Sequence, residues 1–112
     1  LGRRIAVDDT SIYVSEQKTI SEYNWNGKKE QEFSHQLDTT IEAINSIGGF
    51  IFYGDLEGNL VWASKLNPTQ TIKHYFEKPN KIKRITAYKK QQIIVVVTIK
   101  INCYTKIIIK RF

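Results

Sequence analysis

The chain alternates short apolar runs with polar turns, and the clearest example lies between residues 48 and 64. Two runs rich in β-branched and aromatic residues, 50–53 and 60–63, flank the connection Gly54-Asp55-Leu56-Glu57-Gly58-Asn59. Such side chains favour strands, and the runs lack the apolar recurrence every three to four residues that marks a helix. Because glycine adopts positive φ without strain, the two glycines of the connection predict a tight β-hairpin.

The same alternation extends on both sides of this hairpin. Before it, strands are predicted at residues 4–7, 11–14, 19–24 and 30–33. A second set is predicted at residues 40–44, 50–53, 60–64 and 71–76, and a third set at 82–87, 93–98 and from 102 onward. Because short polar turns join the consecutive strands, the pattern predicts antiparallel meanders and an all-β fold.

The predicted strands repeat with a period near forty residues. The second strand of each set ends at Ser15, Gly54 and Thr98, which lie 39 and 44 residues apart. Four strands in a repeat of about forty residues are typical of the blades of a β-propeller. The sequence therefore predicts one partial propeller domain over residues 1–112, with blade-like repeats at 1–36, 37–79 and 80–112, the last incomplete. A small β-barrel or sandwich is the alternative.

The segment Phe50-Ile51-Phe52-Tyr53-Gly54-Asp55-Leu56-Glu57-Gly58-Asn59-Leu60-Val61-Trp62 resembles the hairpin between the second and third strands of WD40-type repeats. In those repeats, a run of small residues leads to an acidic-Gly turn and then to an aliphatic strand that carries Trp. The Gly-His pair that opens well-formed repeats of this type is missing. The hairpin also resembles repeats of quinoprotein-like propellers, but their cofactor-binding residues have no counterparts here, so no cofactor is expected.

The length of the chain bears on its partners. Closed propellers have about four to eight blades, whereas 112 residues supply two blades and most of a third. We therefore expect further blades of the same chain, or other protein subunits, to complete the ring. By analogy with WD40-like propellers, the function expected is that of a non-catalytic protein–protein interaction scaffold, as a fragment or subunit of a larger assembly.

Charge suggests a second function. The net charge is +6, but residues 1–56 hold five Lys/Arg against nine Asp/Glu and residues 57–112 hold twelve against two, so the halves carry −4 and +10. A basic half is typical of modules that bind RNA, DNA or an anionic lipid surface, although Lys on strand edges also protects β-structure from aggregation. The candidate binding residues are Lys81, Lys83, Arg84, Lys89, Lys90, Lys106, Lys110 and Arg111.

No catalytic or metal site is predicted. Ser34, His35 and Asp38 include the residue types of a catalytic triad, but neighbours within one loop rarely converge as a triad requires. The two histidines and the single cysteine lack the spacing of zinc ligands. The oxygen-bearing residues of the 55–59 connection are explained by the turn itself rather than by calcium.

The remaining expectations concern the aromatic residues and the cell compartment. Trp25, Trp62, Tyr23 and Tyr104 lie on or beside predicted third strands and are expected to pack between blades, with an exposed anchor for a protein partner as the alternative. The single cysteine fits a reducing compartment. No apolar run approaches the ~18 residues of a membrane span. We therefore expect an intracellular, cytoplasmic or nuclear protein that does not cross a membrane.

Overall fold

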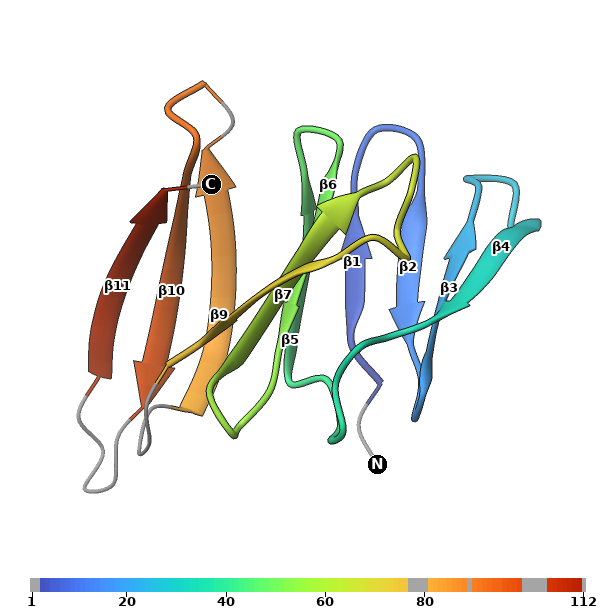
Figure 1. Ribbon diagram of the computed structural model, residues 1–112. Helices are drawn as coiled ribbons and strands as arrows, with labels where there is room; N and C mark the ends of the chain where they lie inside the picture. Colours follow the sequence, from blue (N-terminus) through green and yellow to red (C-terminus); the bar gives the residue numbers. More distant parts are fainter. Residues whose placement is uncertain (1–2, 77–80, 89, 100–104, 112) are drawn as a thin grey trace.

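The computed structural model describes residues 3–76, 81–88, 90–99 and 105–111. Across these ranges the chain forms eleven β-strands in three antiparallel sheets, and within each sheet the strands pair in the order of the chain (Figure 1). The prediction of an all-β fold is therefore confirmed.

The three sheets follow one another along the sequence. The first sheet consists of β1 (Ile5–Val7), β2 (Ile12–Ser15), β3 (Thr19–Tyr23) and β4 (Lys29–Ser34). The second consists of β5 (Ala43–Ile47), β6 (Phe50–Gly54), β7 (Asn59–Ser64) and β8 (Ile72–Tyr75). The third consists of β9 (Lys81–Tyr88), β10 (Ile93–Ile99) and β11 (Thr105–Arg111). The predicted strand from residue 102 falls partly outside the described residues.

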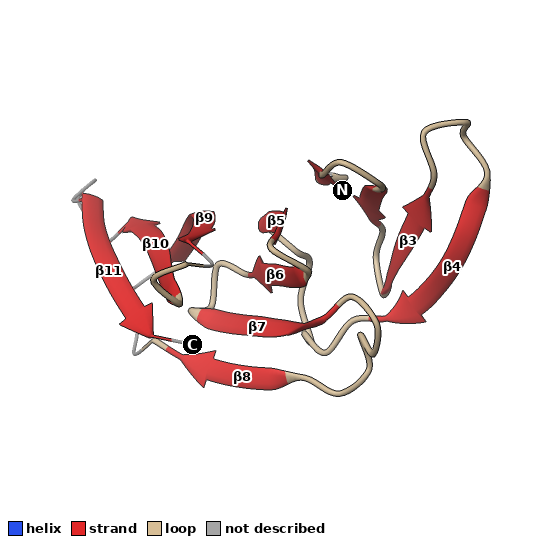
Figure 2. Ribbon diagram, turned by 90° about the horizontal axis from the view of Figure 1, so that it is seen from above, coloured by secondary structure: helices blue, strands red, loops and turns tan. Residues whose placement is uncertain are grey.

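The sheets are arranged like a fan. Figure 2 shows that β5 and β9 lie near the centre of the arrangement, whereas β4, β8 and β11 lie at its outside. The first strand of each sheet contacts the first strand of the next, β1 against β5 and β5 against β9. The inner edges of all three sheets therefore lie side by side.

The central strands of the middle sheet, β6 and β7, are buried on both faces because their side chains alternate. Tyr53 of β6 packs into a cluster with the first sheet, whereas its neighbour Phe52 packs into a cluster with the third. The cluster between the first and second sheets contains Ala6, Tyr13, Ile20, Phe33, Leu37, Ile41, Ile51, Tyr53 and Val61. The cluster between the second and third sheets contains Ala43, Phe52, Leu60, Trp62, Phe76, Ile82, Ile85, Ala87, Ile94 and Val96. These two clusters form the core.

The first strand of the second sheet was predicted at residues 40–44. It begins at Ala43, three residues after the predicted start. Gly48 and Gly49 both have positive φ, of 60° and 85°, and the residues that flank them, Ile47 and Phe50, form the last pair between β5 and β6. Two positive φ values in a two-residue loop define the hairpin turn that twists with its strands. This turn fixes β5 immediately before it, which corrects the prediction.

The predicted hairpin between β6 and β7 is present, but its two glycines have different roles. Gly58 has a φ of 90°, as predicted, whereas Gly54 lies within β6 without a positive φ, so the prediction is wrong for Gly54. The side chain of Asp55 holds the turn, since its Oδ1 accepts the backbone N–H groups of Glu57 and Asn59 at 2.9 Å each. These bonds explain its oxygen-rich sequence without an ion.

Gly54 lies where the second sheet contacts the start of the third. A Cβ atom added to Gly54 would lie 2.8 Å from Cδ1 of Ile82 and 3.0 Å from the backbone oxygen of Asn59. In addition, the backbone N–H of Ile82 donates to the carbonyl oxygen of Asp55 at 3.0 Å. Glycine is therefore needed at residue 54 for space, so that the start of β9 can pack against the end of β6.

The aromatic residues divide between core and surface. Trp62 is buried between the second and third sheets, as expected. Trp25 is 59% exposed, and its indole Nε1 donates to the backbone oxygen of Asp8 at 3.3 Å. Its predicted place in the core is therefore wrong, because it lies on the turn between β3 and β4 rather than on a strand. Tyr104 lies outside the described residues.

Replacement of Gly58 by Val is expected to destabilise the protein by about 1 to 3 kcal/mol, because a β-branched residue is strongly disfavoured at positive φ. Gly58→Asn is the matched control, since Asn tolerates this conformation better. Chemical denaturation of the three proteins measures the effect. Equal unfolding free energies for Gly58→Val and the unchanged protein would contradict the turn geometry.

Replacement of Gly54 by Ala is expected to cost about 1 to 3 kcal/mol through overpacking. Ile82→Val removes the Cδ1 atom that the new methyl group would meet. The double variant should therefore be more stable than the sum of the two single changes predicts, which a double-mutant cycle of unfolding free energies detects. Strictly additive effects would show that the two residues do not meet.

Candidate functional site

An open groove of about 920 Å³ runs along the inner strands of the three sheets. Residues at the start of β1, β5 and β9 and within these strands line the groove. Its charged lining residues are Arg4, Glu42, Lys83 and Arg84, and its apolar ones include Ile5, Ile44, Ile85 and Val95. We refer to this feature as the inner groove. It brings together side chains from all three sheets.

A single carboxylate joins the three sheets at this groove. Oε1 of Glu42 accepts a hydrogen bond from Nη2 of Arg4 at 3.1 Å and another from Nζ of Lys83 at 2.6 Å. Nε of Arg4 also donates to the backbone oxygen of Glu42 at 2.9 Å. Glu42 therefore holds the Arg4 guanidinium and the Lys83 ammonium in place beside the start of β5.

The two cations keep the Glu42 carboxylate ionised. Burial works in the opposite direction, but the hydrogen bonds from Lys83 and Arg4, together with the attraction of their charges, outweigh it and lower the pKa of Glu42. The Glu42 side chain is 17% exposed, whereas those of Arg4 and Lys83 are 41% and 38% exposed. Solvent therefore reaches the cations more easily than the carboxylate.

A β-bulge lies at Lys83, and both Lys83 and Arg84 line the inner groove. Along β9, Ile82 pairs with Thr98 and Arg84 pairs with Val97, so Lys83 is an extra residue without a partner on β10. Such a bulge interrupts alternation and re-aims side chains. The register along β9 therefore shifts between Ile82 and Arg84.

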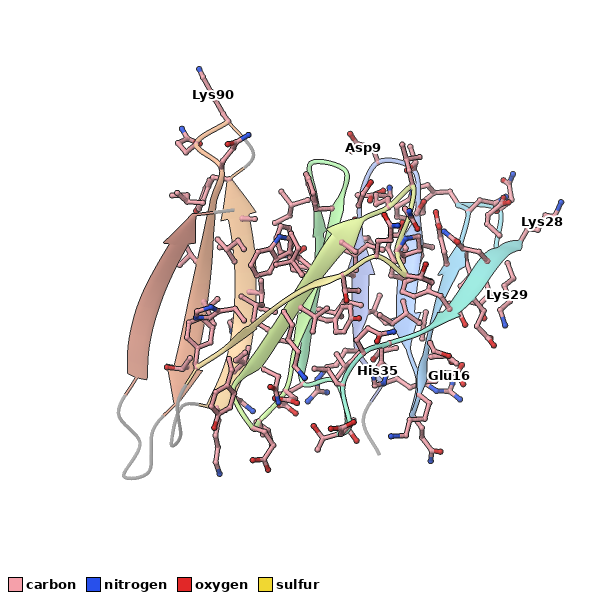
Figure 3. All side chains as sticks on the ribbon, viewed as in Figure 1. Asp9, Glu16, Lys28, Lys29, His35 and Lys90 are labelled. Carbon is pink, nitrogen blue, oxygen red and sulfur yellow. The ribbon has the colours of Figure 1, made fainter. Side chains whose placement is uncertain are left out.

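The other candidate basic residues are not gathered at the groove. Lys81 begins β9 and Lys90 lies in the turn beyond its end, and both are exposed (Figure 3). Lys106, Lys110 and Arg111 belong to β11, and Lys89 lies outside the described residues. The structure thus brings together Lys83 and Arg84 of the predicted set. Their role in binding stays a prediction.

Arg4 and Glu42 belong to the same cluster but were not predicted from the sequence. They are 38 residues apart, and Glu42 and Lys83 are 41 residues apart. The local sequence does not distinguish them, because each is a charged residue shortly before a strand, which is a common place for a charged side chain. The only available signal was the repeat itself, which places the starts of successive inner strands next to one another.

A second polar cluster bridges the first and second sheets. Oδ2 of Asp8 accepts bonds from Oγ of Ser46 at 2.5 Å and from Nζ of Lys65 at 2.7 Å. Burial opposes the charge of Asp8, but these bonds and those from the backbone of Thr10 and Ser11 outweigh it and lower the pKa of Asp8. This cluster ties β5 and β7 to the turn that follows β1.

The loop that contains Ser34, His35 and Asp38 does not form a catalytic triad. His35 is buried, and its Nε2 lies 2.8 Å from the backbone oxygen of Gln17, while its Nδ1 accepts the N–H of Leu37 at 3.2 Å. Both ring nitrogens are therefore engaged by backbone groups, so the imidazole has no nitrogen left to activate Ser34. Figure 3 shows His35 where the chain leaves β4 for the second sheet.

Within the described ranges, no group of three or more His, Cys, Asp or Glu side chains lies close enough to hold a metal ion. Cys103 falls outside those ranges. No helix in the described parts of the chain has the length and apolar character to span a membrane.

The fold matches those of known proteins, although the sequence does not. No protein-family model matches the chain, and no curated protein matches its sequence. Over 93% of its length, the chain is similar in structure to BamB from Moraxella catarrhalis, with a TM-score of 0.60, 14% identity and 30% of that chain covered. Over 95% of its length it is similar to Hsv2p from Kluyveromyces lactis, with a TM-score of 0.57, 10% identity and 38% of that chain covered.

These two structures are β-propeller proteins, so the predicted resemblance to a partial propeller is confirmed at the level of the fold. The two four-stranded antiparallel sheets match propeller blades. The chain spans about a third of the length of the structures it matches, 30% and 38% respectively. The WD40 type of repeat stays a prediction.

Replacement of Glu42 by Gln is expected to lower the unfolding free energy by about 0.5 to 1 kcal/mol near neutral pH, the usual scale for ion pairs that solvent can reach. Because the pKa of folded Glu42 lies below its ordinary value of 4.5, its stabilising effect is present above that value and is lost as the pH falls through the lowered pKa. Denaturation across pH 2–8 should therefore show the two proteins converging in acid. A difference that stays constant with pH would contradict the ion pairs.

Proposed function

We propose that this chain supplies blades to a β-propeller that acts as a non-catalytic protein–protein interaction scaffold. The observation that carries the proposal is a bare apolar face on the first sheet. The proposal is also supported by the structural match, because the chain covers about a third of each solved propeller, 30% and 38% of their lengths.

The bare face belongs to the side of the first sheet that points away from the second. Strand pairing sets Ile5 opposite Val14 and Val7 opposite Ile12, and paired residues share a face of a sheet. Ile5 is 63% exposed and Val7 is 51% exposed, while Ile12 and Val14 are half-buried. We call these four residues, together with the half-buried Tyr23 opposite Ile12, the open face.

A further antiparallel sheet is the occupant that fits the open face. The middle sheet shows the reason, since each of its faces is covered by the apolar face of a neighbouring sheet. Covering an aliphatic side chain contributes about 1.5 to 3 kcal/mol. A sheet with aliphatic residues on the side that meets Ile5 and Val7 would bury the open face in the same manner, whether it comes from the same chain or another.

The surface beyond the open face supports a role in binding proteins. Trp25 projects from the turn between β3 and β4 and is 59% exposed. Exposed Trp side chains frequently anchor protein partners, because they bury a large apolar area in one contact. Both ring nitrogens of His35 are hydrogen-bonded to backbone groups, which argues against catalysis by Ser34, His35 and Asp38.

Binding of RNA, DNA or anionic lipid by the basic half is the alternative. Lys81 and Lys90 lie at opposite ends of β9, an eight-residue strand about 26 Å long at ~3.3 Å per residue, so they do not form one compact patch with Arg84. This spacing favours the scaffold. Affinity for generic RNA or anionic vesicles that falls steeply with salt would favour the alternative.

The isolated 112-residue chain is expected to associate with itself or to unfold readily, because its open face lacks a cover. Val7→Glu should shift any self-associated form towards smaller species, since a carboxylate placed on the open face opposes burial. Native mass spectrometry and sedimentation measure the change. In a longer chain that contains the covering sheet, the same substitution should instead lower the unfolding midpoint.

Leu66→Glu is the matched control, because Leu66 is 96% exposed in the turn after β7 and does not belong to the open face. It adds the same charge and removes an aliphatic side chain of similar size. The proposal requires that Val7→Glu act and that Leu66→Glu have little effect. A stable, cooperatively unfolding monomer of the isolated chain, unaffected by either substitution, would overturn it.

A further inference from the structure

The inner groove has an excess of positive charge that its own carboxylate does not neutralise. Among the described residues that line it, Arg4, Lys83 and Arg84 are cationic and Glu42 is anionic. Because Arg4 and Lys83 share the same oxygen of Glu42, this single negative charge offsets only one of them. The described residues offer no ion-pair partner to Arg84, which is exposed.

The cationic groups are positioned in advance. Glu42 holds Arg4 and Lys83, and Arg84 follows Lys83 on β9 and lines the same groove. A site whose cations are already ordered loses less side-chain entropy when an anion binds. The lowered pKa of Glu42 means that the carboxylate keeps this arrangement at neutral pH.

The rest of the lining strengthens the attraction and limits the size of a ligand. Ile44, Ile85 and Val95 form apolar parts of the wall, and low-dielectric walls concentrate the field of nearby charges. The groove volume of about 920 Å³ lies within the range of small-molecule sites. Asn45 contributes rigidity, since its Nδ2 donates to the backbone oxygen of Ile85 at 2.8 Å and ties β5 to β9.

We propose that the inner groove binds a small phosphate-bearing molecule, with the phosphate at Arg84, Lys83 and Arg4 and the organic part against the apolar wall. A phosphate monoester carries nearly two negative charges near neutral pH, which matches the excess of two positive charges on the lining. Guanidinium groups bind phosphate oxygens in a planar, two-pronged geometry, so Arg84 is the principal contact. The proposed site rests on the charges of the groove and not on the scaffold function, although Ile5 and Val7 of the open face also border the groove.

Titration of the 112-residue protein with phenyl phosphate tests the site, with inorganic phosphate as the comparison ligand. Phenyl phosphate should bind saturably and more tightly than inorganic phosphate, because its ring can contact the apolar wall. Isothermal calorimetry at low and moderate salt measures both affinities. Amide chemical-shift changes centred on β1, β5 and β9 should locate the bound molecule.

Arg84→Gln is expected to weaken phenyl phosphate binding about tenfold or more, the effect of losing one charge-assisted hydrogen bond. Lys28→Gln is the matched control, because it removes one positive charge from an exposed residue beside β4, on the outer side of the first sheet (Figure 3). Since Arg84 is exposed, its replacement should leave the unfolding midpoint unchanged, so lost affinity would not reflect lost structure.

Three results would overturn the proposal. The first is an absence of saturable phenyl phosphate binding at low salt. The second is an equal loss of affinity in Arg84→Gln and Lys28→Gln, which would indicate diffuse attraction to the net charge. The third is preferential binding of a short RNA oligomer that both variants weaken alike. Arg84→Gln separates the two proposals, because it should weaken phenyl phosphate binding and leave self-association unchanged, whereas Val7→Glu alters both features since Val7 also lines the inner groove.

Discussion

Burial of the central strands of the middle sheet, β6 and β7, on both faces is the constraint from which the rest of the architecture follows. Side chains of a strand alternate between faces, so a shift in pairing by one residue would exchange the two clusters. The pairs Gly54 with Leu60 and Phe52 with Trp62 prevent this shift, and the bonds to Asp55 hold the turn that sets them. The side chains on the two faces of β6 and β7 therefore determine how the first and third sheets pack.

Charged contacts at the inner groove are a consequence of this packing. The two hydrophobic clusters bring β1 and β9 to either side of β5, and only then do Arg4 and Lys83 reach the same oxygen of Glu42. The pairs are accessible to solvent and contribute modestly to stability. Their more important effect is on the direction of the cationic groups, which the apolar core alone would not determine.

The sequence was sufficient for the features that depend on local pattern. The hairpin of residues 50–64 could be predicted because aromatic and β-branched runs flank Asp55 and Gly58, and the repeat near forty residues indicated the propeller fold. The start of β5 was misplaced because the short turn at Gly48-Gly49 was not recognised as the end of a hairpin.

The candidate site was only half predictable, for a physical reason. Lys83 and Arg84 stood out as part of a basic run, but the bulge at Lys83 depends on pairing with β10 and leaves no mark in the local spacing. Arg4 and Glu42 meet through tertiary packing across 38 residues. Long-range ion pairs of this kind follow from the fold and cannot be inferred before it.

The contact between Gly54 and Ile82 limits how the repeats can be exchanged. The corresponding last residue of the second strand in the first sheet is Ser15, whose Oγ accepts the backbone N–H of Arg4 at 2.9 Å. A copy of the first sheet inserted before β9 would carry a side chain where Ile82 requires open space. The blades are thus related by repetition without being interchangeable, and gene duplication or module shuffling would have to move residues 54 and 82 as one unit.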